Sequence, residues 1–505
     1  MNLFSNYYFT SFFWTTVSKL LNTILSFISI PILMAQYGKE QYGILSIAVA
    51  CNACVYVFDL GMNVGAVKFI SGWRAEGNFE RIERVVRTNI TFYLLVSLVN
   101  IILFLGVSLF GANYFSISPQ QAELLSTFML ILALFSVMSW VGNVFYQLLV
   151  AHEQLGYAMK VQTVQTLLKI ALLLSIMFFD ISIKEYFFVF TLLLSIGLLP
   201  YAYRCRRSGL IRKFAPALYV ADFKVVLAFS ISIFVLSLLQ IISVQGRPLL
   251  LGIFAENGAS MVADYRIVEL IPNFLVVLCG MYASIFLPKI SAMMVKGDMR
   301  SIQEYANIWT LRISIFSYMI GGAIFFSASE LMFAYLGDAE GQFDYWLKWW
   351  LPAIVLQIHA TPTTSIILAK GISKPLVVVT LLACVVSLPI NVVCLDTLGV
   401  GAAVASYYAY IFIIMAFNYV YYYDNAIGVS GKQVLQRFML PTVAAVVSLL
   451  LCNLLFELLN PWLECHTRRE SILHFIFKSF VWVASYFLVL KSFKIKNAFK
   501  ELNFK

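Results

Sequence analysis

Residues 10–35, TSFFWTTVSKLLNTILSFISIPILMA, form a run of 26 residues that contains one charged side chain, Lys19. A helix that crosses the hydrocarbon core of a bilayer needs about 20 consecutive, mostly apolar residues. The run is therefore long enough to cross a membrane once. It predicts a membrane protein, and the rest of the chain repeats the pattern.

The composition of the whole chain supports the same class. Of 505 residues, 61% are hydrophobic and 12% are charged, whereas soluble domains contain about 25% charged residues. A soluble globule could not bury so much apolar surface, and a nucleic-acid-binding protein is excluded although the net charge is +10. We expect an all-α polytopic membrane protein.

Fourteen apolar stretches can be delimited. They lie at 10–35, 43–66, 89–111, 123–148, 161–179, 185–203, 224–246, 265–288, 304–328, 346–368, 376–395, 401–421, 438–459 and 471–490. Lysine and arginine mark the cytoplasmic connections of such proteins, and with a cytoplasmic N-terminus 24 of them fall on the inner side against six on the outer side. The sequence predicts about 14 spans with both termini cytoplasmic, and the net charge reflects this topology.

The connections leave little room for enzymatic chemistry. All outer loops are short, no nucleotide-binding or hydrolase motif occurs, and the four histidines are scattered. Cys51 and Cys54 have CxxC spacing but lack the further ligands that a zinc site requires. We therefore expect a transporter rather than an enzyme, with no metal and no cofactor.

Polar residues recur on one face of several predicted spans, at intervals of three or four residues. They are Thr15, Lys19, Asn22, Ser26 and Ser29 in the first span; Ser136, Ser139, Asn143 and Gln147 in the fourth; Gln162, Thr166 and Lys169 in the fifth; and Ser230, Ser237, Gln240, Ser243 and Arg247 in the seventh. Either these stripes surround a hydrated cavity or they form hydrogen bonds between packed helices.

Three cations favour the cavity. Lys19, Lys169 and Arg312 lie at similar depth within predicted spans, where each would cost about 2.5–3.5 kcal/mol if it faced lipid. A shared aqueous interior avoids that cost and would attract a phosphate group, with Asn22 and Gln162 contacting sugar hydroxyls. Pairing with buried acids or extension to the membrane surface is the alternative interpretation.

Further charged residues are candidates for coupling or gating. Asp59 lies level with Lys19 and could neutralise it, and such a pair could act as a protonation switch. Near the outer face, a second group predicts either a salt-bridge gate or ordinary interfacial charges; its members are Arg247, Asp264, Arg266 and Glu269.

Several local motifs resemble those of bacterial Wzx-type polysaccharide flippases, which belong to the multidrug/oligosaccharidyl-lipid/polysaccharide (MOP) exporter superfamily. They are IPIL at 30–33, QYGKEQYG at 36–43, FDLGM at 58–62, AVKF at 66–69, DYRI at 264–267 and LPKIS at 287–291. The hydropathy pattern matches this family over essentially the whole chain.

The resemblance implies two pseudo-symmetric six-helix lobes, 1–215 and 216–425, followed by 426–505 with two extra spans and a basic cytoplasmic tail. It implies a multi-pass protein of the bacterial cytoplasmic (inner) membrane. Such a protein moves an undecaprenyl-diphosphate-linked oligosaccharide to the periplasmic leaflet for assembly of a surface polysaccharide such as lipopolysaccharide O-antigen. Its partners would be this lipid, the bilayer and other glycan-assembly membrane proteins.

Other functions stay open at this point. A cation-coupled multidrug exporter of the same superfamily would share the architecture but should favour buried acids over buried cations. A membrane glycan polymerase or ligase should carry larger outer loops. A lipid II flippase would differ only in cargo, and the sequence does not choose among H+ coupling, Na+ coupling and product removal.

Overall fold

The computed structural model describes residues 2–295, 299–337, 342–370, 374–459 and 467–492. All regular secondary structure in these ranges is helical, which confirms the all-α prediction. Each of the fourteen apolar stretches coincides wholly or partly with a described helix. The basic tail expected beyond the last span lies outside the described residues.

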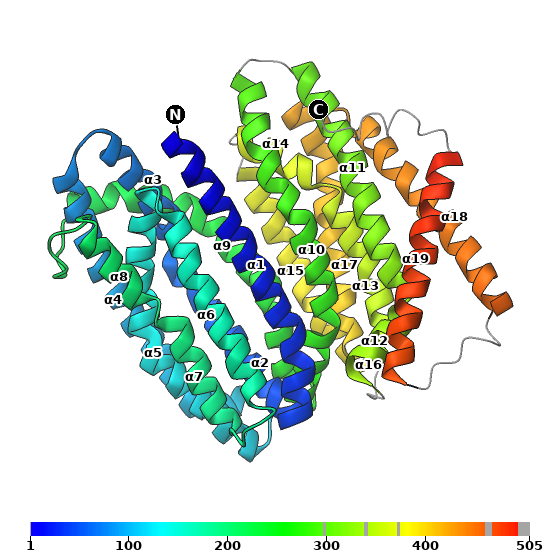
Figure 1. Ribbon diagram of the computed structural model, residues 1–505, viewed down its shortest axis with the longest axis horizontal. Helices are drawn as coiled ribbons and strands as arrows, with labels where there is room; N and C mark the ends of the chain where they lie inside the picture. The colour runs from blue at the N-terminus through cyan, green and yellow to red at the C-terminus, as the bar shows by residue number, and fades with distance from the viewer. Residues whose placement is uncertain (1, 296–298, 338–341, 371–373, 460–466, 493–505) are drawn as a thin grey trace. The chain divides into compact units, whose positions relative to one another are not determined.

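The chain divides into two compact units, Met1–Ala263 and Asp264–Lys505, called unit 1 and unit 2 below. Unit 1 contains nine α-helices and one 3-10 helix within its described residues (Figure 1). They are α1 (Asn2–Tyr37), α2 (Lys39–Val55), η1 (Tyr56–Asp59), α3 (Met62–Ala75), α4 (Phe79–Tyr114), α5 (Pro119–Ala151), α6 (Leu155–Ser175), α7 (Ile183–Ser195), α8 (Leu198–Arg207) and α9 (Val220–Phe254).

Helix α10 (Gly258–Val295) starts in unit 1 and continues into unit 2. The other described helices of unit 2 follow it in chain order. They are α11 (Met299–Phe326), α12 (Ala328–Leu336), α13 (Phe343–Ile358), α14 (Thr361–Lys370), α15 (Lys374–Val393), α16 (Leu395–Leu398), α17 (Gly401–Phe417), the π-helix η2 (Asn418–Ile427), α18 (Gly431–Leu459) and α19 (Arg468–Ser492).

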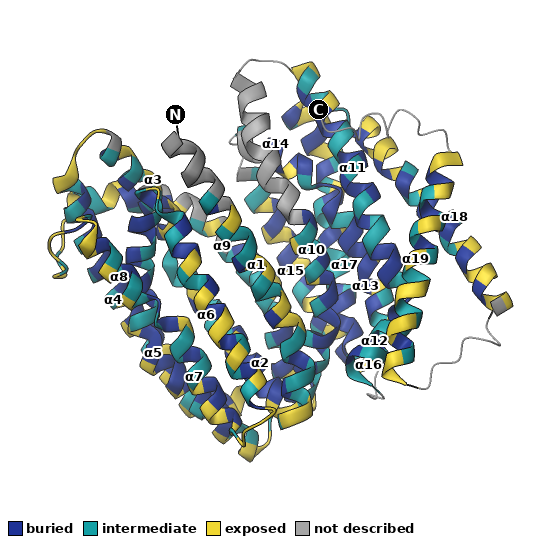
Figure 2. Ribbon diagram, viewed as in Figure 1, coloured by how far each residue is buried: buried dark blue, intermediate teal, exposed yellow. Residues whose placement is uncertain are grey.

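The described surface is that of a membrane protein. Ten helices in the described ranges are long and apolar enough to cross a bilayer. Large apolar side chains stay exposed along them; on α4, Leu98, Ile102 and Leu109 are 54–74% exposed, and Figure 2 shows such exposed stripes beside buried ones. A soluble protein rarely exposes so continuous an apolar surface. The chain is thus a multi-pass membrane protein, while fourteen crossings and cytoplasmic termini stay predictions.

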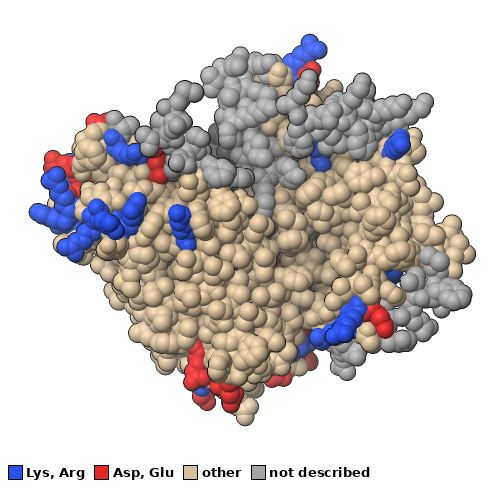
Figure 3. Space-filling view, viewed as in Figure 1, with Lys and Arg blue, Asp and Glu red and all other residues tan. Residues whose placement is uncertain are grey.

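Charged residues of unit 1 occur mainly at the two ends of its helices. In Figure 3, lysine and arginine side chains gather at the end where α4 begins and α8 ends, and acidic side chains gather at the opposite end. The surface between them carries almost no charge. This separation is the arrangement expected when the middle of each helix lies in hydrocarbon.

The second predicted span is not one continuous helix. It breaks between η1 and α3, where Leu60 and Gly61 adopt left-handed backbone angles (φ 49° and 71°). A Cβ atom on Gly61 would lie 2.5 Å from the Ser230 carbonyl oxygen of α9. Glycine is needed here both for the positive φ and for the close approach of α9.

Helix α9, the seventh predicted span, packs within unit 1 against α2, α3 and α4. Asp222 near its start accepts from Arg81 (2.8 Å) and pairs with Arg84 (3.1 Å) on α4. Ser230 is fully buried against the glycine face of α3. This part of the predicted polar stripe therefore serves helix packing, and the division into lobes at 215/216 stays a prediction.

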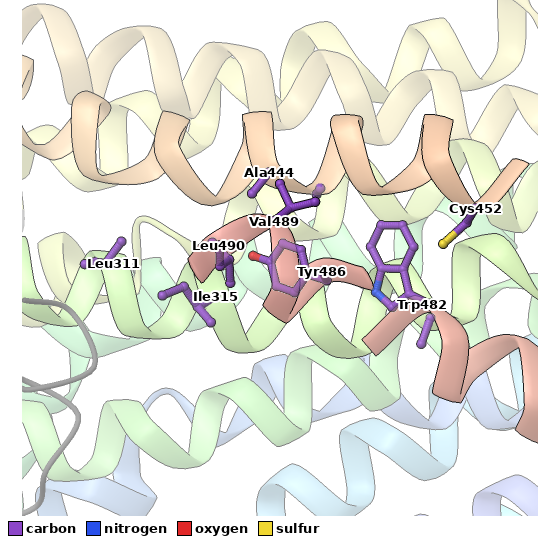
Figure 4. Close-up of a cluster of buried hydrophobic side chains, with 10 residues drawn as sticks. Leu311, Ile315, Ala444, Cys452, Trp482, Tyr486, Val489 and Leu490 are labelled. Carbon is purple, nitrogen blue, oxygen red and sulfur yellow. The ribbon is translucent and has the colours of Figure 1, made fainter. Parts of the chain in front are cut away.

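The two C-terminal helices pack on α11 of unit 2. Trp482, Tyr486 and Leu490 of α19 point into a buried apolar cluster that α18 and α11 complete (Figure 4). Gly322 of α11 provides the space for the Trp482 ring. Lys478, the charge inside the last predicted span, forms an ion pair with Glu330 of α12, which explains how this span tolerates a lysine.

The break in the second span makes a stability prediction. Gly61→Ala should lower the free energy of unfolding by about 1–3 kcal/mol. The new Cβ atom would overlap the Ser230 carbonyl oxygen, and the alanine would have to adopt a positive φ. Thermal unfolding of the purified protein in detergent measures the change.

Gly72→Ala is the matched control, since Gly72 lies in α3, which begins directly after Gly61, and a Cβ atom on it meets nothing within 4 Å. It should be neutral or slightly stabilising. Equal unfolding temperatures for the two variants would contradict the close approach of α9.

Candidate functional site

Helices α1 and α6 lie side by side and carry four of the predicted site residues. A Cβ atom on Gly156 would lie 3.1 Å from Thr10 at one end, and Tyr37 donates to the Ile181 carbonyl oxygen just beyond the other end of α6 (2.7 Å). Between these points Thr166 Oγ1 donates to Asn22 Oδ1 (3.3 Å). The two helices are thus parallel, and a part-buried hydrogen bond links them between these points.

Lys19 and Lys169, the two lysines of the predicted site, flank this contact. Lys19 is exposed on α1, whereas Lys169 on α6 is only 7% exposed. Lys19 precedes Asn22 by three residues on α1, and Lys169 follows Thr166 by three residues on α6. The two lysines are therefore roughly 9 Å apart along the direction of the parallel helices, at 1.5 Å per residue.

The buried lysine has no acidic partner in the described part of the chain. The Lys169 ammonium lies 5.6 Å from the centre of the Phe190 ring on α7, and such a contact offsets only part of the cost of burying a cation. An anionic group would complete the site.

Arg312 lies on α11 of unit 2, with its guanidinium 5.0 Å from the centre of the Trp309 ring and its Nε atom buried without a hydrogen bond among the described residues. The proposal that it faces the same interior as Lys19 and Lys169 stays a prediction.

Asp59 is committed to hydrogen bonds at the break in the second span. Its Oδ1 accepts from Tyr93 Oη (2.5 Å) and its Oδ2 from the Asn63 backbone N–H (3.1 Å), where the positive end of the α3 dipole favours a carboxylate. Gln147 donates to the same Tyr93 oxygen (2.8 Å). Within the described residues, the Lys19–Asp59 pair considered from the sequence is not formed, because other groups already satisfy this carboxylate.

A polar cavity of about 290 Å³ lies inside unit 1 among α3, α5, α6, α7 and α8. Its polar lining consists of four amides and four hydroxyls, all uncharged: Asn63, Asn143, Gln162, Gln165, Ser139, Ser195, Tyr146 and Tyr201. Of the cations and site residues predicted from the sequence, it contains Gln162. The polar stripe predicted on the fourth span thus serves two purposes. Ser139 and Asn143 line the cavity, while Gln147 donates a hydrogen bond to Tyr93 of α4.

The cavity wall includes a second helix break, between α7 and α8. Gln165 Nε2 donates to the carbonyl oxygens of Leu193 (2.8 Å) and Leu194 (3.2 Å) at the end of α7. Non-helical backbone at membrane depth is tolerated where protein satisfies it or where it lines a hydrated cavity. Here the Gln165 amide satisfies the two carbonyls, and the break borders the polar cavity.

The outer charged group is partly assembled in unit 2. Arg266 forms an ion pair with Glu269 (2.6 Å), and Tyr265 donates to the other oxygen of that carboxylate (2.9 Å). In unit 1, Arg247 is buried and donates to the Ser243 carbonyl oxygen (2.5 Å). The proposed gate of Arg247, Asp264, Arg266 and Glu269 therefore stays a prediction.

A family model for polysaccharide biosynthesis proteins matches residues 9–294, which is more than half of the chain. The chain belongs to the polysaccharide biosynthesis protein family. The family match agrees with the resemblance to Wzx-type flippases that the local motifs indicate. No curated protein sequence matches this chain.

Solved transporters share the fold of this family member. Lipid II flippase MurJ in an inward closed conformation is 12% identical, with a TM-score of 0.68 over 95% of this chain and 98% of MurJ. An inward-facing multidrug resistance MATE family transporter of the MOP superfamily is 16% identical, with a TM-score of 0.65 over 78% of this chain and 92% of that one. The bent form of the Vibrio cholerae MATE transporter VcmN is 15% identical, with a TM-score of 0.55 over 86% of this chain and 98% of VcmN. These likenesses show that the chain has the fold of MurJ and of the MATE transporters.

Sequence reasoning missed several residues of the site. Gln165, Tyr146 and Tyr201 line the cavity but do not stand out in an apolar helix. One signal was available: Gly197 and Pro200 lie inside the predicted span 185–203, and glycine with proline in such a run indicates a helix break.

The Asp59 hydrogen bonds allow a matched test. Tyr93→Phe should lower the free energy of unfolding by about 1–3 kcal/mol, because Asp59 Oδ1 loses its donor and the Gln147 amide loses its acceptor, while Asp59 Oδ2 keeps the Asn63 N–H. Chemical or thermal unfolding in detergent checks the value.

Tyr56→Phe is the control. The Tyr56 and Tyr93 rings both pack on Trp140, at 5.2 and 5.7 Å between ring centres, and within the described residues the Tyr56 hydroxyl forms no hydrogen bond. Equal losses in the two variants would mean that ring packing, not the hydrogen bond to Asp59, is being measured.

Proposed function

We propose that the protein is an alternating-access flippase that carries a polyprenyl-diphosphate-linked oligosaccharide from the cytoplasmic to the periplasmic leaflet of the bacterial cytoplasmic membrane. The observation that carries this proposal is the buried Lys169 ammonium on the polar face of α6, without an acidic partner in the described chain. A diphosphate supplies the missing anion. Family membership and the flippase-like fold support a lipid-linked cargo.

The polar face of α6 suits an amphiphilic cargo. Gln162, Gln165, Thr166 and Lys169 fall within about 100° of arc at 100° per residue, so one helix face presents amides, a hydroxyl and an ammonium. In our proposal Lys19 and Arg312 complete the diphosphate site, and Asn22 and Gln162 contact the saccharide. The polyprenyl tail stays in lipid, and motion of the two units exposes the headgroup alternately to each side.

A multidrug exporter is less well supported. Recognition of a cationic drug calls for a carboxylate that faces the binding cavity. Among the described residues the cavity lining contains no carboxylate, and both oxygens of Asp59 already accept hydrogen bonds. A polymerase or ligase is not supported either, since the part of the cavity lining that the structure describes carries no charged group. Lipid II remains a cargo that only transport assays separate from other lipid-linked saccharides.

Coupling is proposed at the charged residues outside the diphosphate site. Asp59 is the candidate for a protonation switch, and Arg247, Asp264, Arg266 and Glu269 are the candidates for an outer gate. Imposed pH and sodium gradients across reconstituted vesicles, with Asp59→Asn alongside, decide among H+ coupling, Na+ coupling and product removal.

The proposal predicts the effect of removing the buried cation. In vesicles containing undecaprenyl-diphosphate-linked oligosaccharide, Lys169→Met should slow flipping at least tenfold, since a hydrogen bond to a charged group contributes about 1.5–3 kcal/mol. Lys19→Ala and Arg312→Ala should also slow it.

Lys160→Met is the matched control, because Lys160 is an exposed lysine about two and a half turns earlier on the same helix. It should flip the lipid within twofold of the unmodified chain. Flipping by Lys169→Met at the unmodified rate would overturn the diphosphate site.

A further inference from the structure

The cavity of unit 1 has an uncharged polar lining, although the cation Lys169 lies on one of the helices that form it. Among the described residues, eight of its thirteen lining side chains are amides or hydroxyls, and none carries a charge. An anion placed there would lose its hydration without gaining a cation. The cavity therefore suits an uncharged ligand that both donates and accepts hydrogen bonds.

Its polar groups have bonding capacity left for such a ligand. Gln165 uses its amide nitrogen on the Leu193 and Leu194 carbonyls, which leaves its carbonyl oxygen as an acceptor. Asn143 offers both a donor and an acceptor, and neither is used by another described residue. Tyr146 and Tyr201, with ring centres 5.9 Å apart, add apolar ring surface beside their hydroxyls.

Size and position narrow the ligand further. A volume of about 290 Å³ is at the small end of ligand sites, which span about 300–1,000 Å³, so it suits one sugar ring rather than a repeat unit. Lys169 follows Gln165 by one helical turn, a rise of about 6 Å. A sugar in the cavity would thus lie next to the proposed diphosphate.

We propose that this cavity is the subsite for the sugar attached directly to the diphosphate, and that it selects an uncharged sugar at this position. The inference rests on the proposed function and adds a specificity site within unit 1. Asn143 and Gln165 bind the hydroxyls of that ring, and the Tyr201 ring, whose hydroxyl donates to the Ala158 carbonyl oxygen (3.4 Å), packs against it, while more distal sugars lie outside the cavity. An acidic first sugar is rejected because its carboxylate would be buried without a counter-ion.

The test compares three probes on the full chain in nanodiscs: undecaprenyl diphosphate bearing one glucose, one glucuronic acid, or no sugar. Equilibrium binding is measured for each. We expect the glucose probe to bind at least tenfold more tightly than the glucuronic acid probe. Asn143→Leu should remove the preference for glucose and leave affinity for the bare diphosphate within twofold.

Two glycine variants make a matched pair. A Cβ atom on Gly197 would lie 3.1 Å from both Gln165 and Tyr201, whereas one on Gly106 meets nothing within 4 Å. Gly197→Ala should therefore reduce the glucose preference, and Gly106→Ala should preserve it. Binding of the bare diphosphate in each sample shows that the variant is folded.

The outcomes separate the two proposals. Diphosphate binding with no preference between glucose and glucuronic acid, or a preference that survives Asn143→Leu and Gly197→Ala, overturns the sugar subsite alone. Failure of the unmodified chain to bind any of the three probes overturns the proposed function and the subsite with it.

Discussion

The structure of unit 1 depends on one constraint: inside hydrocarbon, every backbone N–H and C=O group must find a partner within the protein. Two of its spans are nevertheless interrupted, one after Asp59 and one after Ser195. Each break is stabilised by a polar side chain from a neighbouring segment. Asp59 accepts from the first turn of α3 and from Tyr93, and Gln165 donates to the last carbonyls of α7. The need to satisfy broken backbone thus places polar groups at membrane depth.

Those same polar groups explain how a cavity can exist in so apolar a chain. Gln165 both binds the end of α7 and lines the cavity, and Asn63, bonded through its backbone to Asp59, lines it from α3. Lys169 lies one turn beyond Gln165 on the same face of α6. A neutral cavity and a buried cation are therefore adjacent along one helix, a combination that matches the two parts of a glycosyl diphosphate.

The sequence predicted the all-α membrane fold but only part of the site. Apolar runs predicted most of the described helices, because hydropathy depends on local composition alone, but α12 lies almost wholly in the connection that follows the predicted span 304–328. The breaks were missed: Gly61 and Gly197 do not interrupt an apolar run. The sequence also gave no sign that Tyr93 bonds to Asp59, since Tyr93 is 34 residues away in the chain and reaches Asp59 only after α4 packs against η1. Gln162 was predicted because it belongs to a polar stripe on the fifth span. Tyr201 could not be predicted in the same way, because it lines the cavity only as part of α8, after the helix break that the sequence analysis missed.

The central claim is that the cavity of unit 1 opens to water on each side of the membrane in turn. The most direct measurement is the reaction of Asn143→Cys with a membrane-impermeant thiol reagent, in a chain whose native cysteines are replaced and whose orientation in vesicles is known. Exposed Ser208→Cys serves as a one-sided reference. The account predicts that Asn143→Cys reacts from both sides and that Ser208→Cys reacts from one. Reaction of Asn143→Cys from a single side, or from neither, would contradict it.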